Sequence, residues 1–301
     1  MQTTEVNPNK DKIMVITDTG SDISIEETQD LPLYLVPFHL FHEGVEFKEA
    51  YDMSKEDFYK ILETSDSIPS TAQITVIEYL ELYMNVLQDG YSHLIMVTIN
   101  STGSGTYNSA LQALNLFYED KENKKLTVEV VDSKTYSYVY GDGVLMLAKM
   151  AKDGKTFEEC LEFIKDYFDK AEAVASTYSL KHAKMSGRIS GMKAFIGEAM
   201  GIKPILRVKN HEVKNIDNCR GEKQINQKLI DTCKKYIDEP QNQVISLIYG
   251  SVPQKDVEEL RQSALDQLGV KDVILRKFSS AITINIGPKT IALRYMGRKT
   301  D

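Results

Sequence analysis

Short runs of β-branched and apolar residues alternate with amphipathic segments along the chain, and this alternation restricts its fold more than any other feature. The pattern is typical of α/β proteins, in which a helix connects each strand to a parallel neighbour. Three amphipathic segments begin with a hydroxyl residue that is followed three positions later by an acid, as in a helix capping box. We therefore predict helices at 55–64 after Ser54, at 76–88 after Thr75, and from Thr156 to near Lys170.

The predicted strands divide the chain into two halves with different sheets. In the first half they lie at 12–17, 32–41, 93–99 and 126–132. In the second half they lie at 171–177, 202–209, 211–216, 243–249, 272–278, 281–286 and 290–296. The last two are separated by so few residues that antiparallel pairing is expected, which makes the second sheet mixed. We predict a first domain at 12–170 and a second at 171–301, with the boundary near Lys170.

Composition narrows the class of protein. The 301 residues, of which 42% are hydrophobic, are enough for two ordinary domain cores. Three cysteines at Cys160, Cys219 and Cys233 form no CxxC or Cys/His pattern, so we expect neither disulfides nor a metal site, but a reducing, cytoplasmic setting. A polar N-terminus and the lack of any run of ~18 apolar residues predict a soluble protein that is not exported. The net charge of −8, with both signs mixed along the chain, argues against nucleic acid as a partner.

A loop rich in small and hydroxyl residues, Ser101 to Thr106, follows the predicted strand at 93–99 and precedes a helical pattern. Backbone N–H groups in such a loop lie at the positive end of a helix dipole, which attracts anions. The loop lacks the lysine of a Walker motif, the third glycine of a dinucleotide fingerprint and the GxSxG elbow of hydrolases. Hydroxyl and amide groups without a cation suit a carboxylate better than a polyphosphate. An ordinary capped helix is the alternative interpretation.

Polar residues also follow other predicted strands. Thr71 and Gln73 lie in a predicted loop before the helix at 76–88, Asp18 ends the first strand, and Asp132 ends the strand at 126–132. Ligands of open α/β sheets collect beyond the carboxyl ends of the strands, so we expect these loops to converge on one crevice. Besides a carboxylate site, the crevice could serve a small-molecule transferase that uses Asp18, Asp132 and Ser104 to move a phosphoryl or acyl group.

Seven short motifs give the chain a resemblance to the DegV family of bacterial fatty-acid-binding proteins, from Lys12 to Tyr295. In the order of the family they are ITDTGSDIS, STAQIT, GSGTYNSA, VVDS, SGRIS, GIKPIL and IGPKT. The resemblance implies a first domain with a three-layer α/β/α parallel sheet and a second domain with a two-layer α/β mixed sheet. It also implies that a long-chain fatty acid lies between or beneath the two domains.

The resemblance further implies which residues bind the ligand. By motif position, Thr71 and Ser104 correspond to the threonine and serine that bind the carboxylate in the family, and Gly105 and Asn285 complete the predicted carboxylate site. Such proteins commonly present the fatty acid to a separate kinase, which makes an acyl phosphate for phospholipid synthesis. The chain is therefore expected to be a binding subunit with no catalytic residue, no cofactor and no metal of its own.

Two departures from the family pattern qualify these expectations. Ile74 and Thr75 replace the proline and serine that follow the family's glutamine, so we expect a differently shaped entry to the helix. Asn285 stands where the family often has a histidine, and because an amide carries no charge we predict a weaker pH dependence of binding. Arg188 lies in a basic stretch that the family uses to contact the kinase, with an ordinary solvated surface as the alternative.

Overall fold

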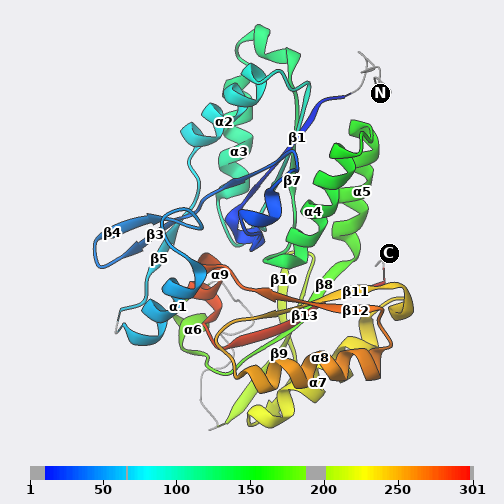
Figure 1. Ribbon diagram of the computed structural model, residues 1–301. Helices are drawn as coiled ribbons and strands as arrows, with labels where there is room; N and C mark the ends of the chain where they lie inside the picture. The colour runs from blue at the N-terminus through cyan, green and yellow to red at the C-terminus, as the bar shows by residue number, and fades with distance from the viewer. Residues whose placement is uncertain (1–10, 66, 188–200, 299–301) are drawn as a thin grey trace.

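The computed structural model describes residues 11–65, 67–187 and 201–298, which form two layered halves and a small three-stranded sheet at one side (Figure 1). The strands are β1 Ile13–Asp18, β2 Leu33–Val36, β3 His39–His42, β4 Val45–Lys48, β5 Ser70–Ala72, β6 His93–Thr98, β7 Thr127–Asp132, β8 Ala171–Thr177, β9 Ile202–Lys209, β10 Glu212–Arg220, β11 Val244–Tyr249, β12 Asp272–Lys277 and β13 Thr290–Met296. The helices are α1 Lys55–Thr64, α2 Val76–Gln88, α3 Thr106–Phe117, α4 Tyr138–Lys152, α5 Phe157–Lys170, α6 Lys181–Ser186, α7 Ile225–Tyr236, α8 Gln254–Leu268 and α9 Ser280–Ile286.

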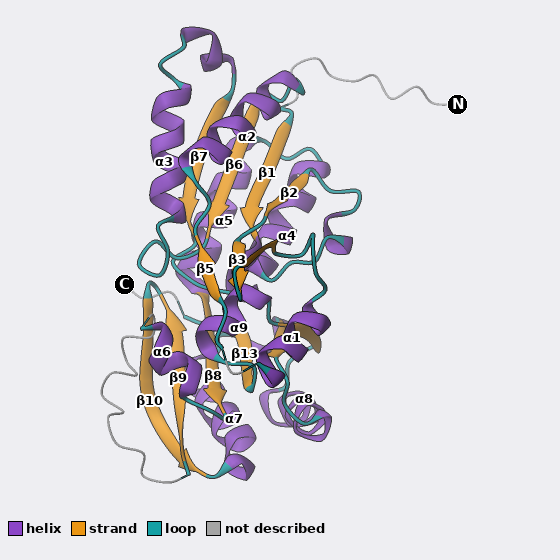
Figure 2. Cartoon of the chain, turned by 90° about the vertical axis from the view of Figure 1, so that its left-hand side faces the viewer, coloured by secondary structure: helices purple, strands orange, loops and turns teal. Residues whose placement is uncertain are grey.

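The first sheet has the strand order β2-β1-β6-β7, and all its pairs are parallel. Consecutive residues of β1 point to opposite faces: Val15 packs in the core cluster that contains α4 and α5, and Ile16 packs in the cluster that contains α2 and α3. Both faces are therefore covered by helices, as Figures 1 and 2 show. This three-layer α/β/α arrangement confirms the fold class expected for the first half.

The second sheet has the strand order β10-β9-β8-β13-β11-β12. Only β11 and β12 pair in parallel among the described strands of this sheet, so the sheet is mixed. Helices α7 and α8 pack with Leu229 and Leu260 against one face. The other face contributes Ile248 and Ala292 to the same apolar cluster as the first sheet. The second half is thus two-layered, as expected, and its open face is covered by the first half.

The predicted strand at 32–41 was wrong in extent. It is two strands, β2 and β3, separated by Pro37 and Phe38, and they belong to different sheets. Proline has no N–H to donate to a ladder, and it marks the point where the chain leaves the parallel sheet. β3 then pairs with β4 and β5, which places Thr71 in a short strand rather than in the predicted loop.

The predicted strand at 281–286 was also wrong, because these residues form helix α9. Its alternating pattern was misleading: residues 280–284 are all buried, so this part of the helix is surrounded by protein on every side. Ser279 caps the helix by accepting a hydrogen bond from the Ile282 N–H. The predicted pairing of 281–286 with 290–296 therefore does not occur, and β13 pairs instead with β8 and β11.

The predicted helix starts were correct. Thr75 and Thr156 each form a complete capping box with the glutamate three residues on, at α2 and α5. Ser54 caps α1 by accepting from the Asp57 N–H. Helix α5 ends at Lys170, and β8, which belongs to the second sheet, begins at the next residue. We propose that the domain boundary lies at this junction.

Candidate ligand-binding cavity

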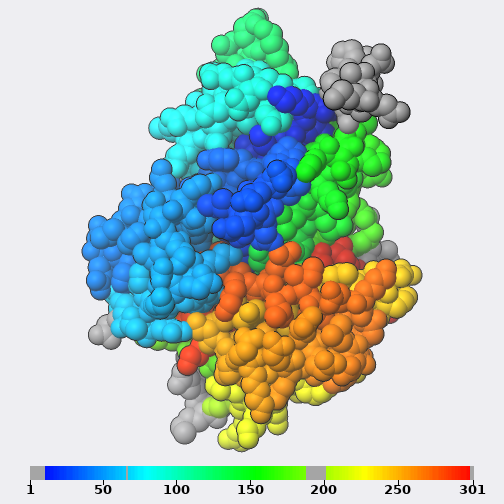
Figure 3. Space-filling model, in the orientation of Figure 1, coloured from blue at the N-terminus to red at the C-terminus, as the bar shows by residue number. Residues whose placement is uncertain are grey.

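A cavity of about 430 Å³ lies where the open face of the second sheet meets the first half. Its volume falls within the range of about 300–1,000 Å³ typical of small-molecule pockets. The face of the molecule drawn in Figure 3 shows the blue and green first half in contact with the orange and yellow second half, with no gap between them. The residues that line the cavity come from both halves, so neither half forms the cavity by itself.

The floor of the cavity is a cross-strand row on the second sheet. Leu206, Ala175, Ala292 and Ile248 are register partners on β9, β8, β13 and β11, and all four line the cavity. Cross-strand partners share one face of a sheet, so these side chains form a continuous apolar strip. The two alanines at its centre leave the space above them empty, while the longer side chains form its sides.

Another part of the cavity wall carries polar groups. Thr71 of β5, Ser104 and Gly105 of the 101–106 loop and Asn285 of α9 line the same cavity, so the structure brings together the four residues predicted for the carboxylate site. Figure 2 places β5 and α9 between the two larger sheets. Three segments that are far apart in the sequence thus supply hydroxyl and amide groups to a largely apolar cavity.

Side chains lie close to the two glycines of the 101–106 loop. A Cβ atom at Gly105 would lie 2.0 Å from Gln73 Oε1, and one at Gly103 would lie 2.5 Å from the Tyr136 hydroxyl oxygen. Both Gln73 and Tyr136 line the cavity, and Gln73 Nε2 also donates to Ser109 Oγ at 3.1 Å. Sequence reasoning placed Gln73 in a loop expected to face the crevice, but it did not single out Tyr136. The paired glycines were the available signal, since glycine in a loop often marks such an approach.

The 101–106 loop offers fewer free amides than the sequence suggested. Four of its backbone N–H groups donate within the protein, to Asp132 Oδ1, Asn100 Oδ1 or the Asn100 carbonyl; they are those of Ser101, Thr102, Gly103 and Ser104. Binding capacity is left to the Ser104 hydroxyl and to the first turn of α3, in which the Thr106 N–H already donates to Ser104 Oγ at 3.3 Å. Ser104 Oγ lies 2.8 Å from Thr106 Oγ1, and when Thr106 donates, the Ser104 hydrogen is available to a ligand oxygen.

The two acids considered for a transferase, Asp18 and Asp132, accept hydrogen bonds from groups of the protein itself. Asp18 is fully buried and accepts hydrogen bonds from the Tyr140 hydroxyl and the Ile99 and Gly20 N–H groups. Burial raises the pKa of Asp18 to about 6. Asp132 accepts from the Ser101 and Lys134 N–H groups. Neither acid lines the cavity in the described residues, so the predicted convergence on one crevice does not extend to them.

Two further buried acids hold helix α9, and with it Asn285. Asp22 Oδ1 accepts from the Ser279 N–H at 2.8 Å, and Glu49 Oε1 accepts from the Ala281 N–H at 2.6 Å. Both carboxyl groups are buried, and burial raises the pKa of Asp22 to about 6 and that of Glu49 to about 7. Carboxylates at a helix N-terminus satisfy its free amides and oppose its dipole. One wall of the cavity therefore depends on two acids that titrate near neutral pH.

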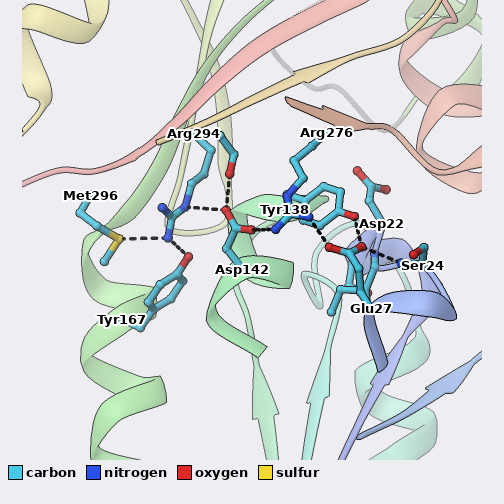
Figure 4. Close-up of polar contacts among 12 residues, drawn as sticks. Asp22, Ser24, Glu27, Tyr138, Asp142, Tyr167, Arg276, Arg294 and Met296 are labelled. Atoms are coloured by element: carbon cyan, nitrogen blue, oxygen red, sulfur yellow. Dashed lines mark hydrogen bonds and ion pairs between the residues drawn. The ribbon is translucent and has the colours of Figure 1, made fainter. Parts of the chain in front are cut away.

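Polar contacts beside the cavity join the two halves (Figure 4). Asp142 of α4 lies one turn beyond Val139, which lines the cavity, and it accepts from Ser246 of β11 at 2.5 Å. Its carboxylate also forms ion pairs with Arg276 of β12, at 3.3 Å, and Arg294 of β13, at 3.6 Å. The rest of this interface cluster consists of Arg276 paired with Glu27, Tyr138 donating to Glu27, and Arg294 bonded to Tyr167. Buried charges are tolerated when paired in this way.

The remaining predictions concern a kinase contact, a metal site and a membrane span. Arg188, predicted to contact a kinase, lies outside the described residues. Within the described ranges, no three or more His, Cys, Asp or Glu side chains are gathered as a metal would require. None of the helices in the part of the chain that the structure describes has the length and apolar character needed to cross a bilayer.

The fold and the cavity define a two-domain α/β protein with a largely apolar pocket that hydroxyl and amide groups also line. The model of the family described as "Uncharacterised protein, DegV family" matches residues 12–298, and the chain belongs to the DegV family. A DegV domain-containing protein of Streptococcus pneumoniae is 29% identical over 286 residues, which cover 95% of this chain and 99% of that protein.

Solved structures of the family share the whole fold. A DegV family protein from Thermus thermophilus, described by its fatty acid binding, superposes with a TM-score of 0.84 at 23% identity, covering 95% of this chain and 100% of that one. A stearic acid-binding protein from Eubacterium ventriosum gives a TM-score of 0.83 at 23% identity, covering 95% and 98%. At this level of identity, the likeness concerns the fold.

Proposed function

We propose that this protein binds a long-chain fatty acid, with the tail in the cavity and the carboxylate at Thr71 and Ser104. The observation that carries the proposal is that one cavity is lined both by the apolar strip on the second sheet and by all four predicted carboxylate residues. The two solved relatives described above are named for binding the same kind of ligand. An amphiphile with one anionic end and a long apolar body matches this distribution of groups.

The tail supplies most of the affinity in this proposal. Burial of a methylene contributes about 0.8 kcal/mol, so a tail with ~14 of them gains roughly 11 kcal/mol before the cost of ordering. Each hydrogen bond from a hydroxyl to the charged carboxylate adds about 1.5–3 kcal/mol. The hydroxyl groups therefore chiefly fix which end of the ligand lies near the 101–106 loop, and Gly105 and Asn285 shape that end.

We further propose that the bound carboxylate is presented to a separate fatty acid kinase in the cytoplasm. The carboxylate oxygen would attack the γ-phosphorus of ATP held by that kinase, giving an acyl phosphate and ADP, while this chain supplies no catalytic group. The three cysteines are free thiols, which suits a reducing compartment. The acids weighed for a transferase are engaged in holding loops, so the binding role is the one the geometry favours.

The first experiment is mass spectrometry of the protein as purified, natively and after organic extraction. A stoichiometric fatty acid supports the proposal and identifies the ligand, whereas an empty protein that also fails to take up added fatty acids contradicts it. The kinase step is tested by adding ATP and a candidate kinase to the loaded protein and trapping acyl phosphate with hydroxylamine. Hydroxamate should form only when both proteins are present, and its formation by this chain alone would refute the binding-subunit role.

The site assignment is tested with Thr71→Ala combined with Ser104→Ala. Loss of both hydroxyl groups should weaken fatty acid binding by more than about a hundredfold, because two charge-assisted hydrogen bonds, worth about 3–6 kcal/mol together, disappear. Ser101→Ala is the matched control, since Ser101 belongs to the same loop but not to the cavity wall. Unchanged affinity in the double variant would show that the carboxylate binds elsewhere.

A further inference from the structure

The hairpin formed by β9 and β10 extends from the tail region of the cavity to the loops at its polar end. In its stem, Leu206, Val208 and Val213 line the cavity, and the last two are cross-strand partners. Its turn is Asn210-His211, and both residues have positive φ, 44° and 69°, as tight hairpin turns require. A single hairpin of the second sheet therefore contacts the ligand space along its stem and leaves its turn to face the first half.

The turn is bonded to two loops of the first half. The His211 N–H donates to the Lys134 carbonyl at 2.8 Å, in the loop after β7. In the loop after β6, Asn100 Nδ2 donates to the His211 carbonyl at 3.3 Å, and the imidazole Nδ1 lies 2.9 Å from Asn100 Oδ1. The ring also lies 3.9 Å from Asp132. These contacts hold His211 against Asn100, the residue that immediately precedes the 101–106 loop.

Asn100 accepts the hydrogen bonds that hold the 101–106 loop in place. It is fully buried, and its Oδ1 accepts from the Thr102 N–H and hydroxyl, both at 3.0 Å. Its backbone carbonyl accepts from the N–H groups of Gly103 and Ser104, at 3.0 and 3.2 Å. The donors around Oδ1 and the acceptor facing Nδ2 fix the orientation of the amide. His211 Nδ1 must therefore carry a hydrogen and donate it to Oδ1.

We infer that Asn100 and His211 are positioning residues, which hold the Ser104 hydroxyl in place for the ligand's carboxylate. This inference rests on the proposed function. Neither residue lines the cavity, so they act through the loop: His211 fixes the Asn100 side chain, and Asn100 fixes the backbone of Gly103 and Ser104. Because the same hairpin also lines the apolar part of the cavity, it fixes the position of the carboxylate site relative to the residues that contact the ligand's tail.

The test compares His211→Ala, which removes the donor, with His211→Asn, whose side-chain amide can occupy the position of Nδ1. Lys214→Ala is the matched control, because Lys214 lies on the same hairpin with its side chain 66% exposed. The probes are two samples of palmitate, one labelled with ¹³C at the carboxyl carbon and one at the terminal methyl. Affinity is measured by calorimetry, and the two resonances of the bound probes are measured by NMR.

His211→Ala should weaken palmitate binding about threefold to tenfold, as expected for one hydrogen bond, and should shift the carboxyl resonance but not the methyl resonance. His211→Asn should restore both values, and Lys214→Ala should change neither. An unchanged carboxyl resonance in His211→Ala, or equal changes at both ends of the ligand, would overturn the inference. Failure of the wild-type protein to bind palmitate or any other fatty acid would instead refute the proposed function, so the two failures are distinguishable.

Discussion

The cap of helix α9 gives a quantitative prediction about pH. Glu49 is buried, and its pKa lies at about 7 instead of the ordinary 4.5, chiefly because of burial. At about 1.4 kcal/mol per pKa unit, the difference corresponds to about 3 kcal/mol between the folded and unfolded states. Glu49→Gln removes this titration. In the wild type, Thr19 Oγ1 donates to Glu49. In the variant, the new amide keeps an acceptor for the Ala281 N–H and presents a donor to Thr19 Oγ1.

The sign follows from which state holds the proton more tightly. The folded pKa of Glu49 is the higher one, so the stability that its neutral form contributes is fully present below about pH 4.5 and is lost as the pH rises through about 7. The wild type and Glu49→Gln should therefore have similar free energies of unfolding near pH 4.5. At pH 8 the variant should be more stable by about 3 kcal/mol. Asp22 titrates in the same window, with a folded pKa of about 6.

The assay is urea unfolding of both proteins between pH 4.5 and 8, with Glu119→Gln, a change at an exposed residue, as the control for altered net charge. The quantity to follow is the difference between variant and wild type, because other groups that titrate in both proteins largely cancel. A difference that stays constant across the range would refute the reasoning. It would mean that Glu49 is either ionised or neutral throughout, and that the cap of α9 does not respond to pH.

Two further predictions concern the cavity wall. Gly105→Ala should reduce fatty acid binding by displacing Gln73, whose Oε1 would lie 2.0 Å from the new Cβ. Adding Gln73→Ala to the same chain should partly restore binding. Equal calorimetric affinities of Gly105→Ala and the wild type would show that the Gln73 side chain moves aside at little cost. Ala175→Leu should fill the space above the centre of the apolar strip and displace about three methylenes of the ligand's tail. Binding of the longest fatty acids should weaken by about 2 kcal/mol, roughly thirtyfold, while shorter fatty acids bind as before. A competition assay over chain length checks this, and a uniform loss at every length would contradict it.

The strands that could be located well from the sequence are those that are buried along nearly their whole length. The predicted runs at 93–99, 171–177 and 290–296 match β6, β8 and β13 to within one residue, because buried strands are continuous apolar segments bounded by polar turns. Helix starts were equally predictable, since Thr75 and Thr156 cap their helices through residues only three positions away. Local chemistry determines these features, so one sequence suffices to find them.

Helix α9 could not be predicted in this way, because what holds it is distant in the sequence. Its first amides donate to Asp22 and Glu49, which lie 257 and 232 residues from their partners. The alternation of 281–286 indicated a half-buried strand, and only tertiary packing on all sides makes the same pattern a helix. Short-range reasoning cannot distinguish the two cases.

The candidate site was predictable in its residue types but not in its supports. Thr71 and Ser104 were identifiable because each belongs to a motif, and the structure places both on one cavity. The engagement of the loop amides with Asn100 and the packing of Tyr136 on Gly103 depend on contacts between separate segments. Such contacts leave no periodic or spaced pattern along the chain.

The shared walls of the cavity also bear on how long the protein survives in a cell. A pocket that exists only after both halves have docked gives its ligand no site on the unfolded chain, so the ligand stabilises the docked form by mass action. At free ligand a hundred times the dissociation constant, this amounts to about 2.7 kcal/mol. Proteases act on opened chains, and the opened fraction would fall accordingly. The lifetime of the protein would then follow the supply of the molecule that it carries.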